Sequence, residues 1–114
     1  MKLRYTPEAV ADLREIGRYI KSVLRNPIAA ANVTRAILDA CASLKSFPEM
    51  GVSVESKTSF ETDLRILPCR GWLAVYRVEP EAGVVSVARI INARQDYMRV
   101  LLGEMTSDSD SDSP

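Results

Sequence analysis

The sequence predicts an α+β fold in which an N-terminal strand and an antiparallel helical hairpin pack on a short antiparallel sheet, in the order β-α-α-β-β-β. Two observations carry this prediction. Two stretches with helical spacing of apolar residues each begin with a polar residue and a proline, and three runs rich in β-branched and aromatic residues follow. The 114 residues, 46% of them hydrophobic, fit one domain with a single core.

The first helix is signalled by Thr6-Pro7-Glu8, which follows a short alternating strand over Lys2–Tyr5. Thr6 is a suitable N-cap, proline fits the first helical position, and Glu8 complements the positive end of the helix dipole. Apolar residues then recur on one face: Val10, Leu13, Ile16, Ile20 and Leu24. A basic stripe, which is usually a solvated helix surface, follows another face: Arg14, Arg18, Lys21 and Arg25.

Asn26-Pro27 repeats the start signal and predicts a second helix over residues 27–46. Its apolar stripe comprises Ala30, Val33, Ile37, Cys41 and Leu44. Because the first helix should end near Arg25, the two helices should form a tight antiparallel hairpin, which ends at residues 47–51.

The remaining chain predicts a loop and three strands. Residues 51–62 are polar and weakly patterned, so we interpret them as a loop. Strands are expected at residues 64–67, 72–79 and 84–92, with turns at 68–71 and 80–83, which gives an antiparallel meander. Residues 96–102 could add a short helix or extension.

The last eleven residues carry four acids and no base, within a Ser-Asp repeat. This composition predicts a disordered acidic tail at residues 104–114, beside a domain at residues 1–103. Such a tail usually keeps a protein soluble, although it could fold over a basic groove. Residues 1–103 retain 15 bases and 11 acids, a net charge of +4, which permits an acidic partner.

Composition also narrows the function classes. No apolar run approaches the ~20 residues of a membrane span, and the N-terminus does not read as a signal peptide, so we expect a cytoplasmic protein without membrane contact. In that compartment we expect Cys41 and Cys69 to be reduced thiols. The chain has no histidine, the commonest general base and metal ligand, and we expect no cofactor and no metal site.

Over residues 1–102 these elements resemble the RelE/ParE toxin superfamily of bacterial type II toxin–antitoxin systems. EAVADLREIGRYI resembles the family's opening helix, and AAANVTRAILDACASLKSFPEMG its second helix with the closing Leu44, Pro48 and Gly51. DLRILPCRGWLAVYRVE resembles the central hairpin, with matches at Arg65, Leu67, Tyr76, Arg77 and Val78. VVSVARIINARQDY resembles the final strand and its exit, with matches at Arg89, Arg94 and Asp96.

The resemblance implies one of two activities. RelE-like toxins cleave mRNA in the ribosome, which requires a base, cations for the phosphate charge and an acid. The resemblance makes Arg65, Arg94 and Tyr97 the catalytic candidates for that reaction. Arginine can grip phosphate with its planar fork, but a pKa above ~12 makes it a poor base. Lys57 is the only lysine after residue 45, and Asn92 stands where many relatives have histidine.

ParE-like toxins instead inhibit DNA gyrase by binding it, which needs a contact surface and no proton relay. We therefore expect a ParE-like toxin that is not an enzyme, with a RelE-like ribosome-dependent endoribonuclease as the alternative. A third reading is a toxin relic or a binding module without toxicity. The expected partners are a cognate antitoxin and DNA gyrase, or the ribosome and mRNA in the alternative. Operator DNA is expected to be bound only indirectly, through the antitoxin.

Seven residues are candidates for binding the target or the antitoxin: Ile16, Ile20, Leu24, Ile37, Arg77, Arg89 and Arg94. The apolar ones should border a groove beside the helical hairpin, together with Cys41. An exposed sheet edge is a second candidate surface, because it can accept an added strand. The arginines have an ordinary interpretation as well, either as surface charges or as partners of Asp63 and Glu79, and Arg94 could cap the exit from the sheet.

Overall fold

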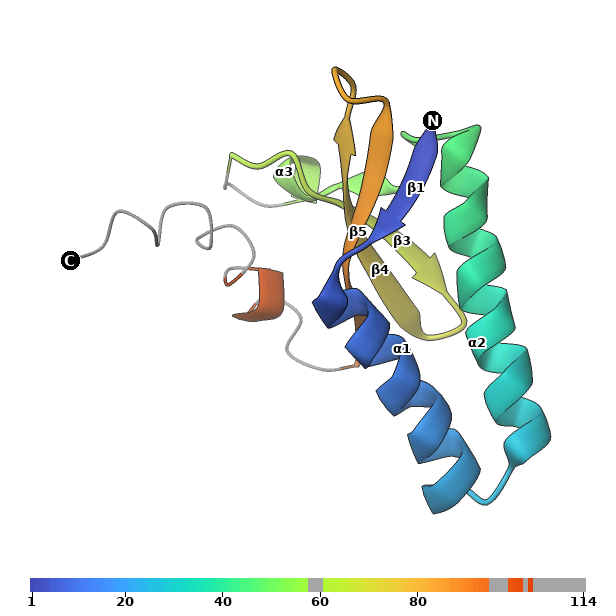
Figure 1. The fold of residues 1–114 in the computed structure, drawn as a ribbon. Helices are drawn as coiled ribbons and strands as arrows, with labels where there is room; N and C mark the ends of the chain where they lie inside the picture. Colours follow the sequence, from blue (N-terminus) through green and yellow to red (C-terminus); the bar gives the residue numbers. More distant parts are fainter. Residues whose placement is uncertain (58–60, 95–98, 102, 104–114) are drawn as a thin grey trace.

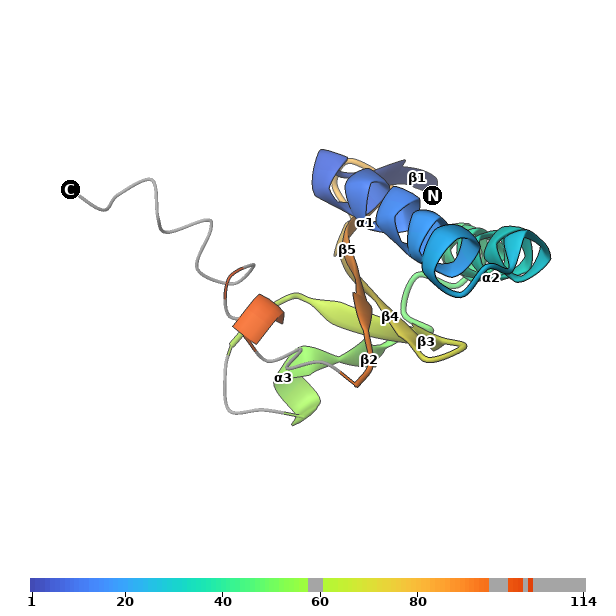
Figure 2. The ribbon, with the colours of Figure 1, turned by 90° about the horizontal axis from the view of Figure 1, so that it is seen from below.

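The computed structural model describes residues 1–57, 61–94, 99–101 and 103. A five-stranded sheet runs through the middle, and two long helices lie side by side over one of its faces (Figures 1 and 2). The α+β class and the predicted order of the main elements are confirmed. The predicted disordered tail lies outside the described residues and stays a prediction.

Both helices of the hairpin begin at the predicted caps. They are α1 (Pro7–Arg18) and α2 (Pro27–Ala42), joined by a π-helical turn, η1 (Tyr19–Val23), and followed by a 3₁₀ turn, η2 (Ser43–Lys45). Thr6 Oγ1 accepts a hydrogen bond from the Ala9 N–H at 3.1 Å, and Asn26 Oδ1 accepts one from the Ala29 N–H at 3.0 Å. The side chain of each cap thus satisfies an N–H that the first helical turn leaves without a partner.

The sheet has the strand order β1-β5-β4-β3-β2. Its strands are β1 (Lys2–Tyr5), β2 (Val52–Ser53), β3 (Arg65–Cys69), β4 (Trp72–Glu79) and β5 (Val84–Asn92). The meander β3-β4-β5 is antiparallel, as predicted. Strand β1 pairs with β5 in parallel, so the sheet is mixed and not wholly antiparallel. Parallel pairing is possible here because the hairpin of α1 and α2 belongs to a long crossover.

The predicted loop at residues 51–62 is wrong in its first half. Val52–Ser53 forms the edge strand β2, and Val54–Lys57 forms a short helix, α3. The side chain of Val54 is only 1% exposed and packs in a second apolar cluster beneath the sheet, with Leu64 and Ile66 among its members. Polar neighbours concealed this contact in the sequence, because one buried residue leaves no periodic pattern.

The predicted turn at residues 68–71 is also too long, since Pro68 and Cys69 belong to β3 and the turn comprises Arg70 and Gly71. Strand β2 pairs only with Ile66 and Arg65, so β3 is the edge of the sheet at Pro68. A proline is tolerated there because its nitrogen faces away from the neighbouring strand, so the sheet loses no hydrogen bond.

Two apolar clusters hold the layers together. The larger one lies between the sheet and the helical hairpin, and Ile16, Ile37, Leu44, Tyr76 and Val87 are among its members. The smaller one lies under the opposite face, where α3 and the helical turn at residues 99–101 cover the sheet (Figure 2). Both faces of the central strands are therefore buried, which explains the near-continuous apolar runs of β4 and β5.

Candidate functional site

A depression of about 660 Å³ lies between α1 with η1 and the last part of β5. It exists because β1 pairs with β5 only as far as Val87, where the chain turns into α1. Ala88 has no partner in β4, which makes it a bulge, and α1 then crosses the bare edge of β5. Tyr19, Leu24, Trp72 and Val100 contribute apolar walls to this groove.

A charged pair closes one side of the groove. The Arg89 Nε and Nη2 atoms donate to the two carboxylate oxygens of Asp12, at 2.7 and 3.2 Å. The Ile90 N–H donates to Asp12 Oδ2 as well, at 2.9 Å. The side chains of Asp12 and Arg89 are 18% and 30% exposed, so water screens this pair less than a surface pair. Asp12 thus neutralises Arg89 and supplies an acceptor to the uncovered strand edge.

The structure brings together four of the seven predicted contact residues: Ile16, Ile20, Leu24 and Arg89 all line the groove. Leu24 is 57% exposed, whereas Ile16 and Ile20 are buried in its floor. Ile37 and Cys41 lie in the core under the helices, at 1% and 0% exposure, so they do not border the groove. The groove therefore runs between α1 and the sheet, and not between the two helices.

The other predicted arginines have separate surroundings. The Arg65 Nη2 atom donates to the backbone oxygens of Glu49 and Gly51, at 2.9 and 2.7 Å. The Arg77 Nε atom donates to Asp63 at 2.9 Å. Arg65 and Arg77 therefore serve the fold, one by holding a loop and the other by pairing across the surface.

Arg94 is exposed just after β5, and its backbone N–H donates to the side chain of Asn92 at 2.8 Å. Arg70 is exposed in the turn between β3 and β4. A backbone bond from the Ala93 N–H to the Gly71 oxygen, 2.9 Å long, joins these two segments at one end of the sheet. Tyr97, the third catalytic candidate, lies outside the described residues.

Sequence reasoning missed several groove residues, among them Asp12, Glu15, Tyr19 and Trp72. The first three lie on the same side of α1 and η1 as the predicted residues Ile16 and Ile20, because positions 12, 15, 16, 19 and 20 follow helical spacing. Their position on this side of the helix could therefore have been predicted from the sequence. Trp72 could not, because only the pairing of β4 with β5 places it beside Asn92.

No metal site is assembled in the described part of the chain, which has no group of three potential ligands. Burial raises the pKa of the Cys41 thiol to about 11 and raises the pKa of Tyr5 as well. Both side chains belong to the main core cluster, so these shifts mark packing and not a reactive centre. None of the helices in residues 1–57, 61–94, 99–101 and 103 has the length and apolar character needed to cross a membrane.

The fold and the groove together define a small α+β protein whose helical hairpin and sheet frame a groove with apolar walls beside an ion pair. The comparison with family models then identifies the lineage. Residues 3–97 match the model for the ParE toxin of the type II toxin–antitoxin system parDE. The chain belongs to this family of type II toxin–antitoxin toxins.

Three solved structures are similar to this chain to different degrees, and the first of them shares its fold. A chain of the chromosomal ParDE toxin–antitoxin system from P. aeruginosa is 24% identical over 82% of this chain and 97% of its own, with a TM-score of 0.68. A chain of the intact E. coli RelBE complex is 20% identical, with coverages of 82% and 98% and a TM-score of 0.49. The isolated E. coli RelE toxin is 17% identical, with coverages of 91% and 97% and a TM-score of 0.49. No curated protein matches the sequence.

Proposed function

We propose that this toxin arrests bacterial growth by inhibiting DNA gyrase through protein contact, and that a cognate antitoxin neutralises it by occupying the groove. The proposal rests on the partners that two of the candidate arginines already have. Arg89 is neutralised by Asp12, and Arg65 is committed to two backbone oxygens. A site that cleaves RNA needs cations facing the phosphate, whereas an apolar groove suits a protein partner.

The chemistry of the groove favours an amphipathic antitoxin segment with acidic residues. Tyr19, Leu24 and Trp72 offer apolar contact along one part of the groove. Arg94 and Arg99 are exposed near its end, on either side of residues 95–98. A segment with apolar residues along the groove and carboxylates at this end would match both parts.

Expression in a bacterium tests the target. We expect filamentation and a DNA-damage response, together with inhibition of purified gyrase in a supercoiling assay. Growth arrest with rapid loss of translated mRNA, and without a DNA-damage response, would support the ribosome-dependent endoribonuclease instead.

Binding of the protein encoded by the neighbouring gene tests the antitoxin surface. Leu24→Arg places a charge in the groove and should weaken binding by about tenfold or more. Leu38→Arg is the matched control, because Leu38 is 43% exposed on α2 and does not line the groove. Equal affinities of the two variants would show that the antitoxin binds elsewhere.

A further inference from the structure

Two exposed arginines are held close together at the lower end of the sheet in Figure 1, where the turn between β3 and β4 meets the end of β5. The Ala93 N–H donates there to the Gly71 oxygen, at 2.9 Å. Arg70 and Arg94 are the immediate chain neighbours of these two residues, so their backbones are close. Two cations this near to each other repel unless an anion lies beside them.

A third arginine adjoins the same part of the groove. Each of the three is exposed and lies within two residues of a side chain that lines the groove: Trp72, Asn92 and Val100. We name this surface the arginine end of the groove: Arg70, Arg94 and Arg99.

The acids beside the groove do not balance the charge of the arginine end. Asp12 and Glu15 both line the groove, and each already pairs with another arginine. None of the three arginines has an ion pair in the part of the chain that the structure describes. Asp96, which lies outside the described residues, can balance one of the three charges. Two charges are therefore left for a further anionic group.

The backbone at Arg70 is unfavourable for an arginine. The φ angles of Arg70 and Gly71 are 50° and 85°, and a hairpin turn with two positive φ angles favours asparagine, aspartate or glycine. Residues other than glycine are uncommon in this left-handed region. A charged side chain kept in an unfavourable backbone conformation beside a groove indicates a contact with another group.

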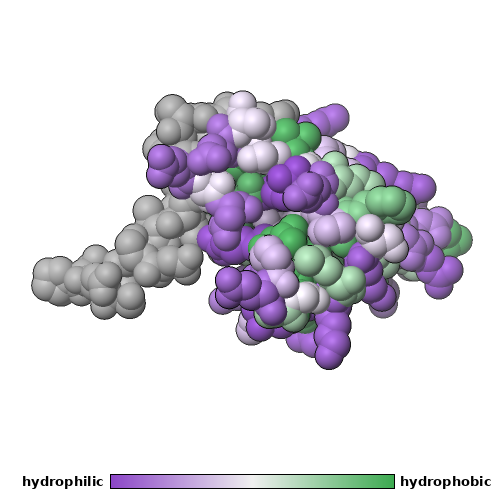
Figure 3. All heavy atoms as spheres, turned by 90° about the horizontal axis from the view of Figure 1, so that it is seen from above, coloured by the Kyte–Doolittle hydropathy of each residue, from purple (hydrophilic) through white to green (hydrophobic). Residues whose placement is uncertain are grey.

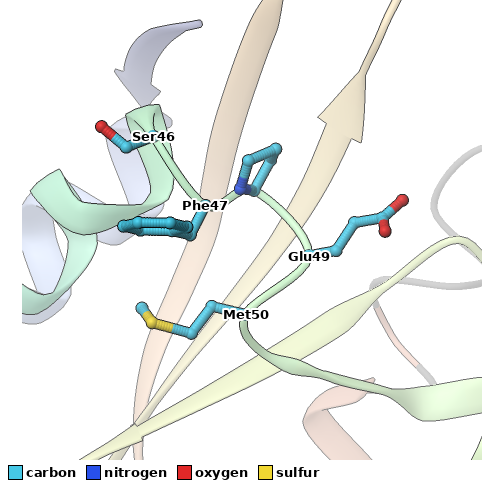
Figure 4. Close-up of a pocket in the computed structure, with 5 residues that line it drawn as sticks. Ser46, Phe47, Glu49 and Met50 are labelled. Carbon is cyan, nitrogen blue, oxygen red and sulfur yellow. The ribbon is translucent and has the colours of Figure 1, made fainter.

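Charges of both signs are present at the opposite end of the molecule. Arg4 pairs there with Glu79. Seen from this end, hydrophilic and hydrophobic side chains are interspersed over the surface (Figure 3). In the loop after α2, Glu49 extends away from Phe47 and Met50 and adds a carboxylate (Figure 4). An acidic segment therefore meets unpaired arginines at the groove and mixed charge at this end.

The chain contains an acidic segment within reach of the arginine end. The acidic tail, residues 104–114, has four acids and no base, and Asp108, Asp110 and Asp112 alternate with serines. It begins five residues after Arg99, and the chain from there to Asp112 can span roughly 25 Å. In an extended segment, alternate side chains share one side and are about 7 Å apart. The three aspartates can thus face one surface together.

We propose that the acidic tail docks in cis on the arginine end of the groove. Its carboxylates lie between arginines that otherwise repel each other, and attachment to the same chain keeps its local concentration high. The tail occupies the place of a partner's acidic groups, so an antitoxin has to displace it. This consequence rests on the proposed function, whereas the docking is a property of the free chain.

The amide NMR spectrum of the full chain, isotope-labelled by cell-free synthesis, tests the docking. The tail-neutral variant combines Asp108→Asn, Asp110→Asn and Asp112→Asn. It should shift the amide signals of Gly71 and Arg94 and the indole signal of Trp72, the only tryptophan in the chain. Added salt should shift these signals of the wild type in the same direction, and should shift those of the variant less.

A matched control separates docking from a change in net charge. It removes three charges from exposed acids outside the groove, by Glu8→Gln, Glu55→Gln and Glu81→Gln. The signals of Gly71, Arg94 and Trp72 should stay in place in this control. Dilution of the wild type should leave them unchanged as well, because a contact in cis does not depend on the protein concentration.

Arg70→Asn tests the surface that receives the tail. Asparagine suits the left-handed backbone at this position, so the thermal midpoint should not fall, although the charge is lost. Neutralising the tail in the Arg70→Asn protein should then shift the amide signal of Arg94 by at most about half as much as in the wild type.

The antitoxin encoded by the neighbouring gene tests the consequence for partners. It should bind the tail-neutral variant by about threefold or more tightly than the wild type or the control. An antitoxin that binds none of these proteins would contradict the proposed function alone, because the NMR signals report docking in the free chain.

Three results would each overturn docking in cis: unchanged signals in the tail-neutral variant, equal shifts in the matched control, or shifts that disappear on dilution. A full effect of the tail in the Arg70→Asn protein would overturn the assignment of the surface. Equal antitoxin affinities of the wild type and the tail-neutral variant would overturn the competition.

Discussion

Asp12 on α1 and Arg89 on β5 form a two-pronged ion pair whose carboxylate also accepts the Ile90 N–H. Sheet hydrogen bonding on this side of β5 ends where β1 turns into α1. The carboxylate therefore takes the place of a neighbouring strand at one position. It thereby joins α1 to the sheet beside the groove.

We expect Asp12→Ala to lower the free energy of unfolding by about 2–4 kcal/mol. The substitution leaves a half-buried guanidinium and a backbone N–H without this acceptor. Asp12→Asn should lower the free energy of unfolding by less, because the amide oxygen can still accept one hydrogen bond. Urea unfolding measures both effects.

Glu15→Ala is the control for this prediction, since Glu15 lies on the same helix but pairs with Arg18 as an exposed surface pair. Its loss should change the free energy of unfolding by less than about 0.5 kcal/mol. Similar losses in the Asp12→Ala and Glu15→Ala proteins would contradict the role assigned to Asp12.

The sequence predicted those parts of the fold that depend on neighbouring residues. The caps at Thr6 and Asn26, the hairpin and the three strands of the meander follow from local spacing and local turn chemistry. The parallel pairing of β1 with β5 and the bond from Ile90 to Asp12 do not, since 78 residues separate the latter two. Periodicity contains no information about contacts across that distance.

The same limit applies to the candidate site. Helical spacing predicts Leu24 and the family resemblance predicts Arg89 as contact residues, and both line the groove. Helical spacing also predicts Ile37, which is buried, because a helical stripe indicates which face is apolar but not what covers it. The π-helical turn was also missed, since regular spacing assumes an uninterrupted α-helix.

Tyr76→Phe should lower the free energy of unfolding by about 1–3 kcal/mol. The Tyr76 side chain is 0% exposed, and its hydroxyl pairs with both Gly51 and Pro48. Phenylalanine keeps the packing but leaves a buried N–H without its acceptor. Urea unfolding should show the loss, and a stability equal to that of the wild type would mean that water replaces the hydroxyl.

Gly51→Ala should destabilise the fold more than Tyr76→Phe does. A Cβ atom at this position would lie 2.7 Å from the Ile66 backbone oxygen and 2.7 Å from the Tyr76 hydroxyl. Neither contact can be relieved without displacing β3 or breaking the bond that holds the loop. We expect the thermal midpoint of Gly51→Ala to fall below that of Tyr76→Phe, and the reverse order would count against a tightly packed loop.

Stability should also fall at high pH because of Cys41. Burial raises the pKa of this thiol from 9.0 to about 11, so between these values the native state keeps a proton that the unfolded chain releases. The contribution of this thiol to the free energy of unfolding should be constant below pH 9 and fall by about 1.4 kcal/mol per pH unit between pH 9 and about pH 11. Tyr5, whose pKa is raised too, acts in the same direction from about pH 10 upward.

Cys41→Ala removes this contribution. Urea unfolding of the two proteins between about pH 8 and pH 10.5 should therefore show a stability difference that is constant at first and then shifts in favour of the variant. Parallel curves over the whole range would mean that the native thiol ionises as readily as the unfolded one.

The last prediction concerns toxicity and the exit from β5. Arg94 is exposed, so Arg94→Ala should change the free energy of unfolding by less than about 0.5 kcal/mol and leave the thermal midpoint almost unchanged. We expect it to abolish growth arrest, because this arginine is a candidate for target contact at the open end of the groove. Arg25→Ala, at the exposed far end of the hairpin, is the matched control and should remain toxic. Induction of each variant at equal protein level, followed by viable counts, separates the outcomes. A folded Arg94→Ala protein with full toxicity would remove Arg94 from the contact surface.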